Sequence, residues 1–157
     1  MAVKIQILST EERAASRFTH KAPILYTDVT GGTLTGTDVS TVALTGSLPV
    51  GTYVKSAGFK LDTAFDASDA SINSCLMTVG DDGDVDRFIV SKELAVDGTE
   101  ILYWITANAT ATLPYVYTTA NTIDAVFTVA GGGSPTIAEL TSGQVTVYLE
   151  IGNFNET

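Results

Sequence analysis

The sequence is poor in the residues on which most catalytic and metal-binding sites depend. It contains one cysteine, Cys75, and one histidine, His20, so neither an intramolecular disulfide framework nor a cluster of histidine ligands is available. No Walker, G-x-S-x-G, C-x-x-C or H-E-x-x-H pattern occurs. We therefore expect a protein that is not an enzyme, in which Cys75 is a buried inert thiol and His20 a solvated loop residue.

Basic residues are scarce as well. The 157 residues include 8 lysines and arginines against 18 aspartates and glutamates, a formal net charge of −10. Residues 1–22 carry +2, so the remainder carries −12. An acidic body repels phosphate groups, and we expect no nucleic-acid partner. No apolar run approaches the length of a membrane span and no signal-peptide core is evident, so a soluble protein of a reducing compartment is expected.

What the sequence does contain is alternation of apolar and polar side chains. In Leu48 to Phe65, a Pro-Val-Gly turn signal is followed by Ala57, Phe59, Leu61 and Thr63 on one face. A period of two is typical of a half-buried β-strand, and abundant threonine, valine and glycine favour β structure. We therefore predict that Ala57, Phe59 and Leu61 belong to the core.

Two stretches near the C-terminus alternate more cleanly. The residues expected to point inward are Ile123, Ala125, Phe127, Val129, Val145, Val147, Leu149 and Ile151. Further strands are expected at 22–29, 39–45, 72–79, 100–106 and 114–118, while residues 87–96 fit either a short helix or a strand. Regularly spaced strands of this kind are typical of a sandwich or a barrel.

The N-terminal 21 residues predict a separate arm. Residues 2–8 alternate, with Val3, Ile5 and Ile7 on one face, and Ser9 and Glu12 stand at capping-box spacing before a short helix. The predicted fold is all-β: an arm of one strand and one helix at 1–21, then a single jelly-roll-like β-sandwich of about eight short antiparallel strands at 22–157.

An acidic loop at 80–86 is the one candidate cation site. Asp82, Asp84 and Asp86 occupy positions 1, 3 and 5 of a calcium loop, and Glu93 occupies position 12. The sixth position requires glycine but holds Arg87, so an EF-hand is rejected. A looser Ca²⁺ site remains as an alternative to a solvated loop, with Asp81, Asp82, Asp84 and Asp86 as its ligands. No other cofactor is expected.

Four aromatic residues, Tyr103, Trp104, Tyr115 and Tyr117, lie close together in the sequence. An exposed aromatic platform binds sugars or partner proteins. The alternative is that some of these side chains are core residues and the others are scattered over the surface.

Three segments resemble small all-β virion proteins of tailed bacteriophages. These segments are LPVGTYVKSAGFKLDTAFDAS, CLMTVGDDGDVDRFI and SGQVTVYLEI, and the resemblance covers about residues 46–151. The shared order is an LPAG-like turn, a strand ending in TAFD, a VGD loop and an alternating last strand. Ile151 departs from the pattern, which has an aromatic residue at this position.

The resemblance implies a head decoration or cement protein on the capsid exterior. Such a protein bridges capsomers, often as a homotrimer; its partner is the major capsid protein, and it passes from the host cytoplasm to the virion. We expect the arm to contact the capsid or a neighbouring subunit, unless it merely completes its own sheet. The candidate contact residues are Ile5, Ile7, Leu8, Arg13, Arg17 and Lys21. The alternative function is a carbohydrate- or receptor-binding β-sandwich of a tail fibre or baseplate.

Overall fold

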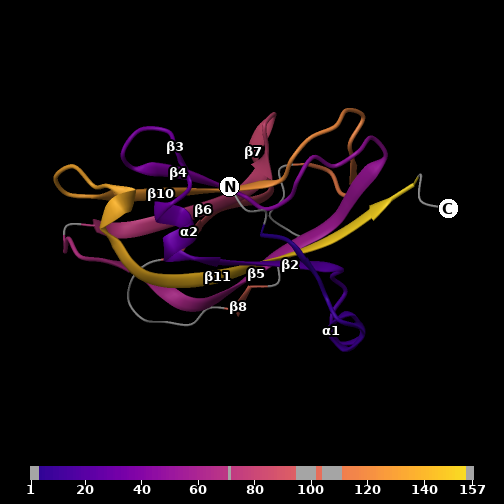
Figure 1. The fold of residues 1–157 in the computed structure, drawn as a ribbon, viewed down its shortest axis with the longest axis horizontal. Helices are drawn as coiled ribbons and strands as arrows, with labels where there is room; N and C mark the ends of the chain where they lie inside the picture. The colour runs from indigo at the N-terminus through magenta and orange to yellow at the C-terminus, as the bar shows by residue number, and fades with distance from the viewer. Residues whose placement is uncertain (1–3, 71, 95–101, 104–110, 155–157) are drawn as a thin grey trace.

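The fold consists of two antiparallel sheets stacked on one hydrophobic core (Figure 1). The structure is a computed structural model, and it describes residues 4–70, 72–94, 102–103 and 111–154. The predicted all-β class is confirmed. No helix in these described ranges is long and apolar enough to cross a membrane.

The first sheet, sheet A, has the order β1-β2-β11-β5-β8, and β9 also pairs with β5. Its strands are β1 (Gln6–Ile7), β2 (His20–Leu25), β5 (Thr52–Ala67), β8 (Leu102–Tyr103), β9 (Tyr115–Val116) and β11 (Leu140–Asn153). The second sheet, sheet B, has the order β3-β4-β10-β6-β7. Its strands are β3 (Thr33–Leu34), β4 (Val39–Ala43), β6 (Ile72–Asp81), β7 (Asp84–Glu93) and β10 (Asp124–Gly131). The short helices are α1 (Thr10–Ala15), α2 (Tyr26–Thr30) and the 3₁₀ turn η1 (Ile137–Glu139).

The predicted number and length of the strands need correction. β5 and β11 span 16 and 14 residues, whereas β1, β3, β8 and β9 have two residues each. The register of the β5–β11 pair shifts at several points, for example between Glu150 and Ile151. Each shift interrupts the alternation of apolar and polar side chains along the strand. In the sequence, one long strand therefore looks like several short ones.

The predicted core face of β5 is confirmed at three positions. Ala57, Phe59 and Leu61 are all buried. Thr63, which the simple alternation places on the same face, is exposed instead. The register against β11 shifts between Leu61 and Thr63, and such a bulge redirects the side chain.

The core joins the two sheets directly. The rings of Phe65 on β5 and Phe127 on β10 lie 5.8 Å apart between their centroids. Cys75 of β6 is buried in the same cluster, and burial raises the pKa of its thiol to about 12. The predicted burial of this thiol is confirmed. The predicted inward residues of the two C-terminal strands are also buried, apart from Ile151, which packs partly exposed against the core.

Two segments differ from the strands expected of them. The segment at 22–29 continues as a strand only to Leu25 and then turns into α2, because the Asp28 carboxylate accepts a hydrogen bond from the Leu25 N–H and Gly31 ends the helix. Of the two alternatives for residues 87–96, the described part is strand: β7 runs to Glu93 in a hairpin with β6.

The N-terminal arm contains the predicted strand and helix. Ser9 and Glu12 form the capping box of α1, with the Ser9 hydroxyl accepting from the Glu12 N–H and the Glu12 carboxylate from the Ser9 N–H. β1 pairs with β2, so residues 6–7 form the edge of sheet A. The expected boundary between arm and body, after Lys21, falls inside β2.

Gly143 is a position at which β11 passes very close to a core side chain. Its φ is +132°, and a Cβ built there would lie 2.4 Å from the Phe65 ring. Only glycine combines that backbone conformation with so close an approach.

Gly143→Ala is therefore expected to lower the free energy of unfolding by about 3 kcal/mol, through backbone strain and overpacking of Phe65. The matched control is Gly46→Ala, because a Cβ at Gly46 meets nothing within 4 Å. Urea denaturation of both variants measures the difference. Equal midpoints would show that β11 does not approach Phe65 in this way.

Candidate functional site

The acidic loop at 80–86 is a tight hairpin turn. β6 ends at Asp81 and β7 begins at Asp84, so only Asp82 and Gly83 lie between the strands. The side chain of Asp81 is fully buried, whereas Asp82 is exposed. The turn thus directs one carboxylate inward and another into solvent.

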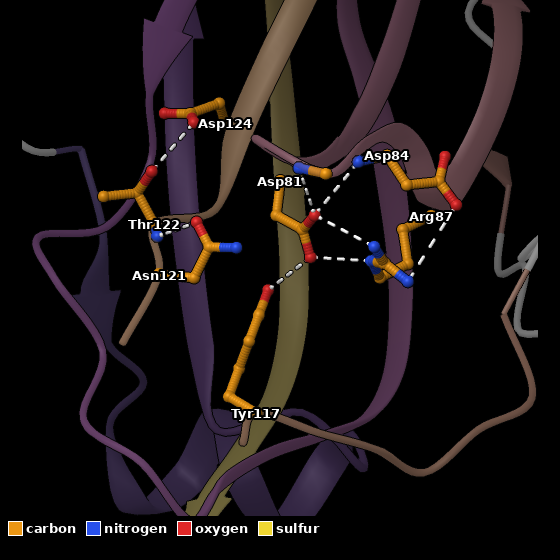
Figure 2. A network of polar contacts seen from close by, with 8 residues as sticks. Asp81, Asp84, Arg87, Tyr117, Asn121, Thr122 and Asp124 are labelled. Carbon is orange, nitrogen blue, oxygen red and sulfur yellow. Dashed lines mark hydrogen bonds and ion pairs between the residues drawn. The ribbon is translucent and has the colours of Figure 1, made fainter. Parts of the chain in front are cut away.

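Asp81 is the centre of a network of polar contacts (Figure 2). Arg87 donates to both of its oxygens, from Nε at 2.6 Å and from Nη2 at 3.2 Å. The N–H groups of Gly83 and Asp84 donate to Oδ1, and the Tyr117 hydroxyl donates to Oδ2 at 3.2 Å. Five donors therefore satisfy the buried charge, as such a charge requires.

The network connects the two sheets. Tyr117 follows β9 of sheet A, and its backbone pairs with Gly51 and Thr52, whereas Asp81 and Arg87 belong to sheet B. Burial, and then the charge of Asp81, raise the pKa of the Tyr117 hydroxyl far above its usual value, so the hydroxyl remains a donor. The guanidinium carbon of Arg87 also lies 4.3 Å from the centroid of the Tyr115 ring. This arrangement is suited to holding the sheets together.

Asp124 lies near this network on the outer side of sheet B. It accepts a hydrogen bond from the Thr122 hydroxyl at 3.0 Å (Figure 2). Burial raises the pKa of its carboxyl, and the charges of Asp82 and Asp81 raise it further. Asp81, Asp82 and Asp124 are among the residues that line a hollow of about 170 Å³. The residue was not predicted, because nothing in the sequence connects position 124 with the 80–86 loop.

The four residues of the predicted cation loop have separate roles. Asp81 is bound by Arg87, while Asp84 and Asp86 interact with each other, and the hydrogen bond with Asp84 raises the pKa of Asp86. Among the residues that the structure describes, no group of three or more histidine, cysteine, aspartate or glutamate side chains is placed to hold a metal ion. A Ca²⁺ ion would have to displace Arg87 from Asp81.

The apolar residues of the arm point in different directions. Ile5 packs against the core and its N–H donates to Leu44 O, and Leu8 is buried with its N–H bound to Thr19 O. Ile7, between them, is 68% exposed. The expected common face of Ile5 and Ile7 is therefore wrong, because Ile7 pairs with His20 of β2 whereas Ile5, outside β1, is bonded to Leu44.

The basic residues of the arm also differ in their contacts. Lys21 pairs with Glu12 at 2.5 Å, a contact that lowers the pKa of Glu12 to about 2. Arg17 is exposed and lies 3.8 Å from Glu150. Arg13 is exposed, and its Nε donates to Leu8 O.

A cleft of about 400 Å³ separates the arm from the end of β11; we call it the arm cleft. Its lining includes Ile7, Arg13, His20, Leu48, Pro49 and Ile151. It forms because β2 pairs with β11 only up to the pair His20–Leu149, whereas β11 continues along β5 to Asn153.

His20 lies in this cleft, not in a solvated loop as the sequence suggested. It begins β2, it is half-buried, and its Nδ1 lies 2.7 Å from the Thr19 hydroxyl oxygen. Burial, and then the charge of Arg13, lower the pKa of its imidazole. The location of His20 could not be predicted from the sequence, because the cleft brings together residues that are far apart in the chain.

The aromatic residues do not form one described surface. Tyr117 is buried, and Tyr115 packs edge-on against both Phe88 and Tyr117. The backbone of Tyr103 pairs with Phe59, and Trp104 lies outside the described residues. Tyr117 thus belongs to the core, as the alternative interpretation of the aromatic cluster allowed.

Comparison of this chain with models of protein families, with curated proteins and with solved structures found no match in any of the three.

Replacing Asp81 tests the network. Asp81→Ala leaves Arg87, whose side chain is only 16% exposed, without its main partner, and we expect a loss of about 3 kcal/mol in the free energy of unfolding. Asp82→Ala at the exposed neighbour is the control and should change it by less than about 0.5 kcal/mol. Chemical denaturation measures the free energy of unfolding of both variants. If Asp81→Ala were as mild as its control, the network would not hold the sheets together.

A melting experiment tests the cation loop. Because five protein donors already occupy the Asp81 oxygens, we expect the same melting midpoint in calcium and in EDTA. A higher midpoint in calcium that Asp81→Ala abolishes would establish a structural ion instead.

Proposed function

We propose that this chain is a structural virion protein that binds the exterior of an assembled bacteriophage capsid and stabilises it. The observation that carries the proposal is the sequence resemblance to small virion proteins. Its three segments correspond to β5, the β6–β7 hairpin and β11, which include the longest strands of both sheets. We also propose the finer points that the resemblance implies: a jelly-roll-like arrangement, a homotrimer and the major capsid protein as partner.

The proposed role is mechanical and requires no catalysis. A protein that binds the assembled lattice more tightly than free capsid subunits stabilises that lattice by mass action. Many copies on one shell allow modest contacts to hold firmly. A sandwich whose sheets are joined by a packed core and by the Asp81 network is a suitable rigid adaptor.

The arm is the proposed contact element. Of its candidate residues, Ile7, Arg13 and Arg17 are exposed, so their side chains are available to a partner. Leu8 and Ile5 support the fold, and Lys21 fixes α1 through Glu12. Figure 1 shows α1 on the side of sheet A that faces away from sheet B, where a partner can reach it.

Two measurements test the proposal. Mass spectrometry of purified virions should find this chain in stoichiometric amounts with the capsid protein. Purified protein should co-sediment with capsids, and comparison of expanded with unexpanded shells reports which state it recognises. Absence from virions would end the proposal; presence in tail fractions alone would support the tail-fibre or baseplate alternative.

A further inference from the structure

The arm cleft contains a positive charge that has no carboxylate partner among the described residues. Six of the eight basic residues lie within 4.0 Å of a carboxylate: Lys4, Arg17, Lys21, Lys55, Lys60 and Arg87. Arg13 and Lys92 form no ion pair with the described residues, and only Arg13 lines the cleft. In a chain with a net charge of −10, an arginine without a carboxylate partner is unusual and suits an external anion.

The backbone around Arg13 holds its side chain in place. Its Nε donates to Leu8 O at 3.0 Å, which leaves both Nη groups without a hydrogen-bond partner in the described part of the chain. The N–H of Arg13 donates to Ser9 O in the backbone of α1, and Ser9 and Glu12 form the capping box of the same helix. The Glu12–Lys21 pair then fixes this short helix to β2. The guanidinium is therefore positioned before any ligand arrives, which lowers the entropic cost of binding.

The cleft that Arg13 lines also has apolar residues in its lining. Leu48, Pro49 and Ile151 line the cleft beside Ile7, whose side chain is 68% exposed. A large apolar side chain left in water at the rim of a cleft gains free energy when a partner covers it. A guanidinium and apolar side chains in one cleft together favour a ligand that carries both a negative charge and an apolar group.

We propose that the arm cleft receives a segment of a partner protein that places a carboxylate beside a bulky apolar side chain. The carboxylate lies against the Nη groups of Arg13, where a planar guanidinium binds both oxygens. The apolar side chain lies against Ile7, Leu48 and Pro49. The identification of the partner as the assembled capsid rests on the proposed function, whereas the chemistry of the segment rests on the cleft alone.

His20 provides a direct reporter, because it is the only histidine and lines the same cleft. The charge of Arg13 contributes to lowering the pKa of its imidazole. A carboxylate bound at Arg13 offsets that charge and favours the imidazolium, so binding should raise the pKa of His20.

The first experiment follows the His20 ring signal by NMR during titration with 4-methylpentanoate, a carboxylate with a branched alkyl chain. We expect a saturable shift and a higher His20 pKa in the wild-type protein, and at least about fivefold weaker binding in Arg13→Gln. The matched controls are Lys55→Gln, which removes an exposed cation outside the cleft and should bind as wild type, and 4-methylpentanamide, which should not raise the pKa. No saturable shift, or equal binding by Arg13→Gln, would overturn the proposed chemistry.

The second experiment measures co-sedimentation of the same variants with capsids. Arg13→Gln and Ile7→Ser should bind at least about fivefold more weakly than wild type, whereas Lys55→Gln, which removes an exposed cation outside the arm and the cleft, should not. Both altered side chains are exposed, so circular dichroism and melting should show unchanged folding. If the wild type binds capsids and all variants bind equally, the cleft is not the contact and the inference fails while the proposed function survives. If the wild type does not bind, the proposed function fails, and the NMR titration alone decides whether the cleft has the stated chemistry.

Discussion

The pairing of β5 with β11 is the constraint on which the rest of the structure depends. The two strands run antiparallel from Thr52 opposite Asn153 to Ala67 opposite Leu140. β2 pairs with the free side of β11, and β8 and β9 pair with β5, so every strand of sheet A except β1 contacts this pair directly. One end directs Phe65 into the core against Phe127, and the other extends past β2 and forms a wall of the arm cleft. The same pair of strands thus positions both a contact between the sheets in the core and one wall of the arm cleft.

The β5–β11 pair lies in sheet A and does not by itself fix the position of sheet B. Two different interactions hold sheet B against sheet A. Apolar packing around Phe127 is non-directional and tolerates small movements. The contacts of Asp81 with Arg87 and Tyr117 are directional, and they connect the β6–β7 hairpin to the segment after β9. A buried ion pair of this kind contributes little net stability but strongly disfavours arrangements that leave its charges unpaired.

The sequence predicts those parts of this fold that depend on local pattern. The core faces of β10 and β11, the capping box at Ser9 and Glu12 and the buried state of Cys75 all follow from period or spacing. The predictions fail at Thr63, where a bulge changes which face of the strand the side chain points to. They also fail at Asp28, where a hydrogen bond between its side chain and the backbone turns the strand into a helix. The Asp81 network and the arm cleft were not predictable, because each joins segments whose proximity exists only after the sheets form. One part of the Asp81 network had a signal in the sequence. Arg87 occupies the position at which a calcium loop requires glycine, and in the structure its guanidinium binds Asp81, the residue before position 1 of that loop.

The burial of Cys75 has a practical consequence for the study of this protein's dynamics. The thiol is 1% exposed on a central strand of sheet B, and its raised pKa keeps it protonated and unreactive while the sandwich is closed. Alkylation by iodoacetamide therefore requires opening of the interior, and its rate reports the equilibrium between closed and open forms. Because the chain has no other thiol, one mass shift records that event without any label being introduced. The protein thus contains a native probe of how often its two layers separate, free in solution or bound to a partner.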